Sequence, residues 1–380
     1  MTLYIILTLV AWLCGVTCSM HILRLGNMAR KAARRTLRTE NLPPVSIVMT
    51  VHNQQQALQA TLPAILSQNY PAPFEVIVVD MNSEDNTIEM LEEMEKTYVH
   101  LRHTFCPDSA RDISLSRLAL TLGFRSACYE WVLIMSPEAS PQSSQWLVGM
   151  AQSMQDNADA VQGFAFCTHP HGWTGIKSHF FQLWQQSLWM PWMTKHKPYR
   201  ADRSCLAYRK SLFMSRQGFA SSFSLRFGAT TLLVNHNVAR GRMTLALHPE
   251  AFLGVRQPSA TAWHQQRVFY METRRHMHHA LPYRLWYATR LWTHYIWMPL
   301  AAFTLLHFHL PLYMAYACAA LWFVALVVEG TAWHITAHRM HARSYVLLYP
   351  LLRTLIPWWD INAWLRWRLE SRKTFRKKFV

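Results

Sequence analysis

The sequence is poor in charged residues, in acidic ones above all, and in glycine. Charged residues make up 16% of the 380 residues, against about 25% in an average soluble domain. With 51% hydrophobic residues and 12 glycines, the chain is neither intrinsically disordered nor collagen-like. A mean hydropathy of −0.01 is too low for a chain made mostly of membrane helices. The composition therefore favours one soluble domain with membrane attachments.

Cysteine is scarce and acids are outnumbered. The seven cysteines are an odd number without a CxxC pair, which argues against a disulfide framework or a zinc knuckle and favours a reducing compartment. Lysine and arginine total 38 against 21 acids, a formal charge of +17. Such an excess favours nucleic acid, anionic lipid or a phosphorylated substrate as partner.

An uncharged run opens the chain. Residues 3–22 carry no charge and are long enough to cross the roughly 30 Å hydrocarbon core of a membrane. Six basic residues follow: Arg24, Arg30, Lys31, Arg34, Arg35 and Arg38. A cleaved signal peptide carries its positive charge before the apolar run, so this order predicts a retained anchor over 1–24, a basic linker over 25–43, and a cytosolic domain after them.

A second apolar stretch lies near the end of the chain. It runs from about Leu291 to Val328 and is interrupted by Pro299 and the 307–311 segment, which predicts a transmembrane hairpin over 285–335. The tail over 336–380 is amphipathic and basic, and four tryptophans suit a membrane interface: Trp358, Trp359, Trp364 and Trp367. A solvated basic tail is the alternative. Because the basic residues concentrate beside apolar segments, we expect lipid and not nucleic acid as the partner.

Between these segments, residues 44–270 read as alternating strands and helices. The β-branched runs at 45–49 and 75–79 are typical of strands, and 58–66 and 87–96 have helical spacing. Strands this apolar, separated by helices, predict a largely parallel sheet covered on both faces.

Polar residues follow the first two strands. Thr50 and His52 come at the end of the first strand, and Asp80, Ser83 and Asp85 at the end of the second. Ligands of such sheets bind at the carboxyl ends of the strands, where a carboxylate accepts hydrogen bonds from a nucleobase or ribose. Turns of this composition also cap helices without binding anything.

The order of several motifs adds information that no single one carries. The segments VSIVMTVHNQ, LPAILSQNYP, FEVIVVDMNSEDNT, ISLSRLALTLGFRSACYEWVLIM, CLAYRKSLF and QGF follow one another over residues 44–270. Together they resemble the membrane-bound family 2 glycosyltransferases, which have the α/β, Rossmann-like GT-A fold.

The resemblance implies transfer of a sugar from a nucleotide-diphospho-sugar, with inversion, to a polysaccharide or a lipid-linked acceptor at the inner or plasma membrane. It implies a cytosolic catalytic domain, a Mg²⁺ or Mn²⁺ ion that neutralises the diphosphate, and a carboxylate base. By position, six residues match the nucleotide-binding set: Thr50, His52, Asp80, Ser83, Asp85 and Arg117. Arg117 is the one expected to meet the diphosphate. The acceptor-side QxxRW-like stretch is suggested by Trp263, Gln266 and Arg267.

The departures from the family lie at the chemical positions. The metal-binding DxD motif is degenerate, because Ser136 stands for the first aspartate and Glu138 for the second. Glu138 is therefore the one candidate metal ligand in this motif. The GEDD motif, which carries the base, reads Gly-Ala-Thr-Thr and ends in Thr230 and Thr231. Neither threonine accepts a proton at neutral pH, and losing a base costs about 10²- to 10⁴-fold in rate.

Two interpretations of these departures stay open. One is a transferase that works through Glu138 and a relocated base, for which Asp202 and Glu250 are the candidates by elimination. The other is a catalytically silent relative that binds nucleotide or partners. A third and remote interpretation comes from the histidines, since His334, His338 and His341 fall on one face of a predicted helix, as in the His boxes of membrane di-iron oxidases.

Overall fold

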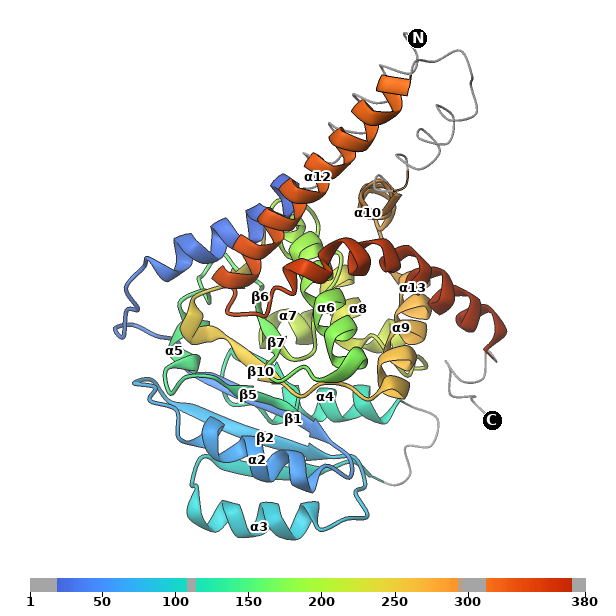
Figure 1. Ribbon diagram of the computed structural model, residues 1–380. Helices are drawn as coiled ribbons and strands as arrows, with labels where there is room; N and C mark the ends of the chain where they lie inside the picture. The colour runs from blue at the N-terminus through green and yellow to red at the C-terminus, as the bar shows by residue number, and fades with distance from the viewer. Residues whose placement is uncertain (1–18, 108–113, 293–294, 296–311, 371–380) are drawn as a thin grey trace.

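The computed structural model describes residues 19–107, 114–292, 295 and 312–370. Figure 1 shows a sheet domain from which α12 (Leu312–Arg339) projects, with α13 (Tyr349–Leu369) lying across the domain near the base of that helix. The sheet domain begins at residue 45, close to the predicted boundary.

The main sheet has seven strands in the order β3-β2-β1-β4-β8-β6-β9. Their bounds are β1 Val45–Val51, β2 Phe74–Asp80, β3 Leu101–Phe105, β4 Trp131–Met135, β6 Ala160–Gly163, β8 Cys205–Arg209 and β9 Met243–Ala246. The predicted strands at 45–49 and 75–79 are confirmed as β1 and β2, which pair in parallel. The expectation of a largely parallel sheet holds for six of the seven strands, because β8 alone runs antiparallel to its neighbours β4 and β6, whereas β6 and β9 again pair in parallel. The fold is thus α/β with a mixed sheet.

Helices cover the sheet on both faces. Those of the first half are α2 Gln55–Leu66, α3 Thr87–Thr97, α4 Leu115–Ser126 and α5 Trp146–Ala151, and those of the second half are α6 Gly172–Met193, α7 Lys210–Ser215, α8 Ala229–Asn237, α9 Ala260–Thr273 and α10 Leu281–Trp292. The predicted helices at 58–66 and 87–96 are confirmed as α2 and α3. Alternate residues of β1 face the two layers: Val48 packs on the α4 side and Ile47 on the α2 side, which gives two separate cores.

A second, small sheet lies beside the first. Its order is β5-β10-β7, with β5 Ala139–Pro141, β10 Leu253–Val255 and β7 Ala165–Cys167. Because β5 follows β4 after a turn of three residues, this sheet fixes the segment that leaves the carboxyl end of β4. That edge of the main sheet is where the predicted site residues gather.

One described helix is long and apolar enough to cross a membrane. The span is Ala319–Arg339 within α12, and large apolar side chains such as Tyr316, Phe323 and Val327 are exposed along α12. Residues 1–18 of the predicted anchor, and the break at 307–311 on which the predicted hairpin depends, lie outside the described residues. The N-terminal anchor and the transmembrane hairpin therefore stay predictions.

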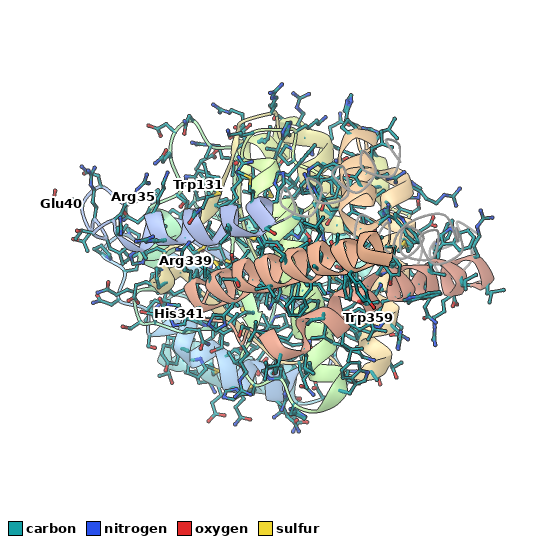
Figure 2. The ribbon with its side chains drawn as sticks, turned by 45° about the horizontal axis from the view of Figure 1, so that its top comes forward. Arg35, Glu40, Trp131, Arg339, His341 and Trp359 are labelled. Carbon is teal, nitrogen blue, oxygen red and sulfur yellow. The ribbon has the colours of Figure 1, made fainter. Side chains whose placement is uncertain are left out.

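The lower end of α12 joins the rest of the protein. It packs against the helical residues 19–33, where the Thr336 hydroxyl donates to the Ile22 carbonyl at 3.0 Å (Figure 1). Glu329 of α12 and Arg353 of α13, both almost fully buried, form an ion pair at 3.7 Å. Figure 2 labels Arg339 and His341 where α12 ends, and Trp359 on α13. These contacts hold the apolar helix in a set position on the sheet domain.

Candidate functional site

The turns after β1 and β2 are joined by side-chain hydrogen bonds. Asp80 accepts from the Ser83 hydroxyl at 2.5 Å and from the Ser83 N–H at 2.9 Å, and the Asn53 N–H donates to the same hydroxyl at 2.9 Å. Asp85 accepts from the Gln55 N–H at 3.2 Å. Asp80, Ser83 and Asp85 of the predicted nucleotide set thus lie in a turn that is bonded to the end of β1, but Asp80 is 1% exposed and its carboxylate already shapes the turn. Its contact with a nucleoside stays a prediction.

Next along the sheet edge is the turn after β4, where the degenerate DxD motif falls. The carbonyl of Pro137 accepts from the Thr61 hydroxyl of α2 at 2.9 Å, which anchors the turn. Ser136 is buried, whereas Glu138 is exposed. The structure therefore presents one carboxylate at this turn.

A cavity of about 470 Å³ opens beside this turn. It extends from the carboxyl ends of β1 and β4 to α6, α8, α9, α10 and α13. It brings together nine of the residues singled out in the sequence: Thr50, Ser136, Glu138, Asp202, Thr230, Thr231, Trp263, Gln266 and Arg267. His52, Asp80, Ser83, Asp85, Arg117 and Glu250 do not line it.

Arg117 requires a correction. We expected its guanidinium to meet a diphosphate, but the residue is fully buried. Its guanidinium donates to the Leu225 carbonyl at 2.8 Å, the Ser222 hydroxyl at 2.9 Å and the Phe227 carbonyl at 2.7 Å. Burial lowers its pKa to about 10, so it remains charged at neutral pH. The side chain braces the 222–227 segment at the cavity wall, and no contact with a ligand is open to it.

The first turn of α8 carries Thr230 and Thr231, which the sequence predicts to stand at the position of the base. Gly228 precedes the helix at φ +76°, a conformation that L side chains rarely adopt, and an added Cβ would collide with Thr273. Thr230 and Thr231 are each 6% exposed. The Thr231 hydroxyl donates to the Ala201 carbonyl at 2.9 Å, which ties this turn to the segment leading into β8.

The acceptor-side residues lie on α9, which begins at Ser259, whose hydroxyl accepts from the Ala262 N–H at 3.2 Å. The i, i+3, i+4 spacing puts Trp263, Gln266 and Arg267 on one face of this helix. The Arg267 guanidinium lies 4.6 Å from the centre of the Trp263 ring and 4.2 Å from that of Phe181. Gln266 is exposed within the cavity lining, so it is free to contact a ligand there.

A buried network from the C-terminal helix completes this wall, and we did not predict it. Asp360 of α13 accepts from Arg267 at 2.8 Å and from the Tyr287 hydroxyl at 2.6 Å, and Gln185 donates to the same hydroxyl at 2.9 Å. Burial, and then the charge of Asp360, raise the pKa of Tyr287 well above its usual value. The sequence carried one signal, since Asp360 is the single acid between residues 330 and 369.

The cavity is cationic and has polar groups without partners. Seven arginines line it, against the three acids Glu138, Asp202 and Asp360; the arginines are Arg200, Arg203, Arg226, Arg256, Arg267, Arg274 and Arg284. Among the described residues, Arg267 Nη1, the Tyr283 hydroxyl and Gln186 Oε1 are buried without a hydrogen-bond partner. Such groups are costly to leave unpaired, so the cavity suits an anionic ligand with many hydroxyls.

The donor set allows only a sparse metal site. Within the described part of the chain, no group of three His, Cys, Asp or Glu side chains is placed to hold an ion. Glu138 alone is the carboxylate of the DxD-like turn, and Mg²⁺ accepts one protein carboxylate when phosphate oxygens and water complete its shell. The residues therefore fit an ion that a bound diphosphate brings with it.

The structure does not place the three histidines of the His-box interpretation on one face of a helix. The predicted helical face of His334, His338 and His341 ends early, because α12 stops at Arg339 and His341 has φ +53°. His334 instead lies 3.0 Å from the Ser344 hydroxyl.

Two curated proteins are similar to parts of this chain. The glycosyltransferase AglE of Haloferax volcanii is 29% identical over 143 residues, which are 37% of this chain and 45% of that protein. Poly-beta-1,6-N-acetyl-D-glucosamine synthase of Staphylococcus epidermidis is 30% identical over 97 residues, 25% of this chain and 21% of that one. The chain thus spans less than half the length of the curated relatives it matches.

A solved structure extends the likeness to the whole fold. The mannosyltransferase PcManGT of Pyrobaculum calidifontis, in complex with GDP-Man and Mn²⁺, superposes with a TM-score of 0.53 at 16% identity, over 95% of this chain and 98% of that one. Residues 46–223 match the family described as Glycosyl transferase family 2, just under half of the chain. The sheet domain of this chain is thus similar to glycosyl transferase family 2 domains over residues 46–223, and its fold is that of PcManGT.

Proposed function

We propose that the protein transfers a sugar, with inversion, from a nucleotide-diphospho-sugar to an acceptor at a membrane surface. The observation that carries the proposal is the cationic cavity at the carboxyl ends of β1 and β4, with seven arginines against three acids. A diphosphate brings negative charge and a sugar brings hydroxyls, which are the groups that such a lining binds best. PcManGT, which shares the fold, was solved with GDP-Man and Mn²⁺.

Different residues would bind the nucleoside and the acceptor. Thr50, together with the neighbouring His52, Asp80, Ser83 and Asp85, marks the nucleoside end, and Trp263, Gln266 and Arg267 mark the acceptor end. A divalent cation bound with the donor would be held by Glu138 and would offset the charge of the leaving diphosphate. The arginines of the lining stabilise the same charge.

The surface of the C-terminal helices supports action at a membrane. On α13 the side facing α9 carries Asp360, while the exposed side chains include Leu351 at 53%, Trp358 at 59%, Trp364 at 44% and Leu369 at 87%. Exposed tryptophan and leucine beside basic residues are typical of a helix that lies in the headgroup layer. We propose that α13 rests on the cytosolic face of the inner or plasma membrane and carries the cavity to a polysaccharide or lipid-linked acceptor.

The second candidate is a catalytically silent relative that keeps nucleotide binding. It is favoured by Ser136, Thr230 and Thr231, which leave the usual metal and base positions without a carboxylate. This second function would use the same cavity to bind nucleotide and differs from the first only in that no sugar is transferred.

The test is a thermal-shift screen of purified protein with UDP- and GDP-sugars and with free UDP and GDP, with and without Mn²⁺. A ligand at a free concentration of 100 times its Kd stabilises the folded state by about 2.7 kcal/mol, and this stabilisation is readily seen as a rise in Tm. Absence of any shift at millimolar nucleotide would contradict both candidates. Donor hydrolysis by the same protein separates the two candidate functions, because only a transferase splits the sugar–phosphate bond.

Protease added to intact cells tests the cytosolic location, and it should leave the 44–270 domain uncut.

A further inference from the structure

Three carboxylates line the cavity among the described residues, and no histidine does. They are Glu138, Asp202 and Asp360. An acceptor hydroxyl must lose its proton during inverting transfer, and a side chain that takes it must lie in the cavity. The choice of base is therefore a choice among these three residues.

Two of the three have another role, Asp360 in the structure and Glu138 in the proposed function. Asp360 accepts from Arg267 at 2.8 Å through one oxygen and from the Tyr287 hydroxyl at 2.6 Å through the other. Both oxygens of Asp360 are therefore engaged by protein donors that would have to be displaced by an acceptor hydroxyl. Glu138 lies on the turn after β4, on the donor side, where its charge belongs to a cation and the diphosphate.

Asp202 is held differently. Its backbone N–H donates to the buried Gln162 side chain at 2.9 Å, and one carboxylate oxygen, Oδ1, accepts from the Ser204 N–H at 2.9 Å. The structure gives the second oxygen, Oδ2, no hydrogen-bond partner among the described residues. The residue thus has a backbone held by Gln162, one carboxylate oxygen bonded to Ser204 and one oxygen available to a ligand.

Asp202 lies next to the first turn of α8, which carries Thr230 and Thr231. The Thr231 hydroxyl of α8 donates to the carbonyl of Ala201, the residue before Asp202, at 2.9 Å. The first turn of α8, where the GEDD carboxylate is absent, therefore touches the segment that carries Asp202. Cys205, three residues further on, does not compete, because burial, and then the charge of Asp202, raise the pKa of its thiol far above neutrality.

We infer that Asp202 is the general base, so that the carboxylate missing from α8 is supplied by the neighbouring segment that leads into β8. This inference rests on the proposed transferase function. In the step, the acceptor oxygen forms a bond to the anomeric carbon while the bond from that carbon to the diphosphate oxygen breaks. The hydroxyl proton passes to the Asp202 carboxylate, and the nucleoside diphosphate leaves with the electron pair.

The experiment compares the wild-type full chain with Asp202→Asn. Asparagine keeps the oxygen that accepts from Ser204 but takes up no proton. Turnover of the donor that the wild type hydrolyses or transfers should fall by about 10²- to 10⁴-fold. The Kd for UDP or GDP should stay within about threefold. Asp156→Asn, which changes an exposed acid outside the cavity lining, is the matched control and should keep wild-type turnover.

A rescue variant guards against a merely structural effect. Thr230→Asp in the Asp202→Asn background returns a carboxylate to the first turn of α8, and turnover should recover at least tenfold. Wild-type turnover in Asp202→Asn would overturn the inference and leave the proposed function standing. Nucleotide binding by the wild type without turnover of any UDP- or GDP-sugar would also overturn the inference and favour the silent relative. Absence of nucleotide binding would overturn the proposed function itself.

Discussion

The ion pair between Arg267 and Asp360 fixes the C-terminal helix over the cavity. Their side chains are 8% and 15% exposed and their charged atoms lie 2.8 Å apart. Burial lowers the pKa of Arg267, and Asp360 and Tyr287 oppose that shift, so the guanidinium depends on its partner. Breaking a buried pair by removing one partner costs about 3–5 kcal/mol, because the other charge stays buried and uncompensated. We expect Asp360→Ala to release α13 from α9 by this amount.

Hydrogen exchange of the α13 backbone measures the release. A loss of 3–5 kcal/mol in local stability should speed exchange of these amides by about 100- to 1000-fold or more, while β1 and β2 amides change far less. Asn362→Ala, which changes an exposed residue of the same helix, should leave exchange nearly unaltered. The double variant Arg267→Met with Asp360→Leu should recover most of the protection, since apolar groups of similar size replace buried ion pairs at little cost.

Two outcomes would refute this reasoning. If Asp360→Ala leaves α13 exchange unchanged, the helix is held by its other contacts, such as the 2.8 Å hydrogen bond from Trp367 to Glu272. If the double variant is no better protected than Asp360→Ala, the loss does not come from an orphaned charge.

Three further changes test other parts of the structure. Glu138→Gln should reduce the Mn²⁺-dependent part of nucleotide affinity by about 10- to 100-fold, measured by titration with and without Mn²⁺, and an unchanged dependence would remove Glu138 from the metal site. Arg117→Leu removes the donor of three acceptors, two of them buried, at about 1–3 kcal/mol each, so Tm should fall by roughly 5–10 °C. Weakened nucleotide binding at constant Tm would instead indicate that Arg117 contacts the diphosphate. Gly123→Ala puts a Cβ 2.3 Å from Val48 Cγ1 and should cost about 1–3 kcal/mol in urea unfolding, a cost that adding Val48→Ala should partly relieve.

The local sequence pattern was enough to predict the first strands of the sheet. The runs at 45–49 and 75–79 are mostly apolar and end in polar turns, so they predict buried parallel strands, and β1 and β2 are buried and pair in parallel. The ordered motifs likewise led to the family, because motif order survives where single residues such as Ser136 have changed. These features depend on residues close together in the chain.

Contacts between distant residues could not be read in this way. The direction of β8, the partner of Arg117 and the pairing of Arg267 with Asp360 each join residues far apart in the chain, 93 positions in the last case. The sequence suggested that Arg117 binds phosphate, because a positive charge indicates a polar partner but does not identify it. In the structure the residue is buried and donates to carbonyl oxygens of the protein, such as that of Leu225. Asp202 looked like one candidate among several until packing placed Ala201 against α8 and tied up Asp360. A side chain acquires its chemical role from which neighbours exclude water from it and which of its atoms they leave unpaired, and folding sets both.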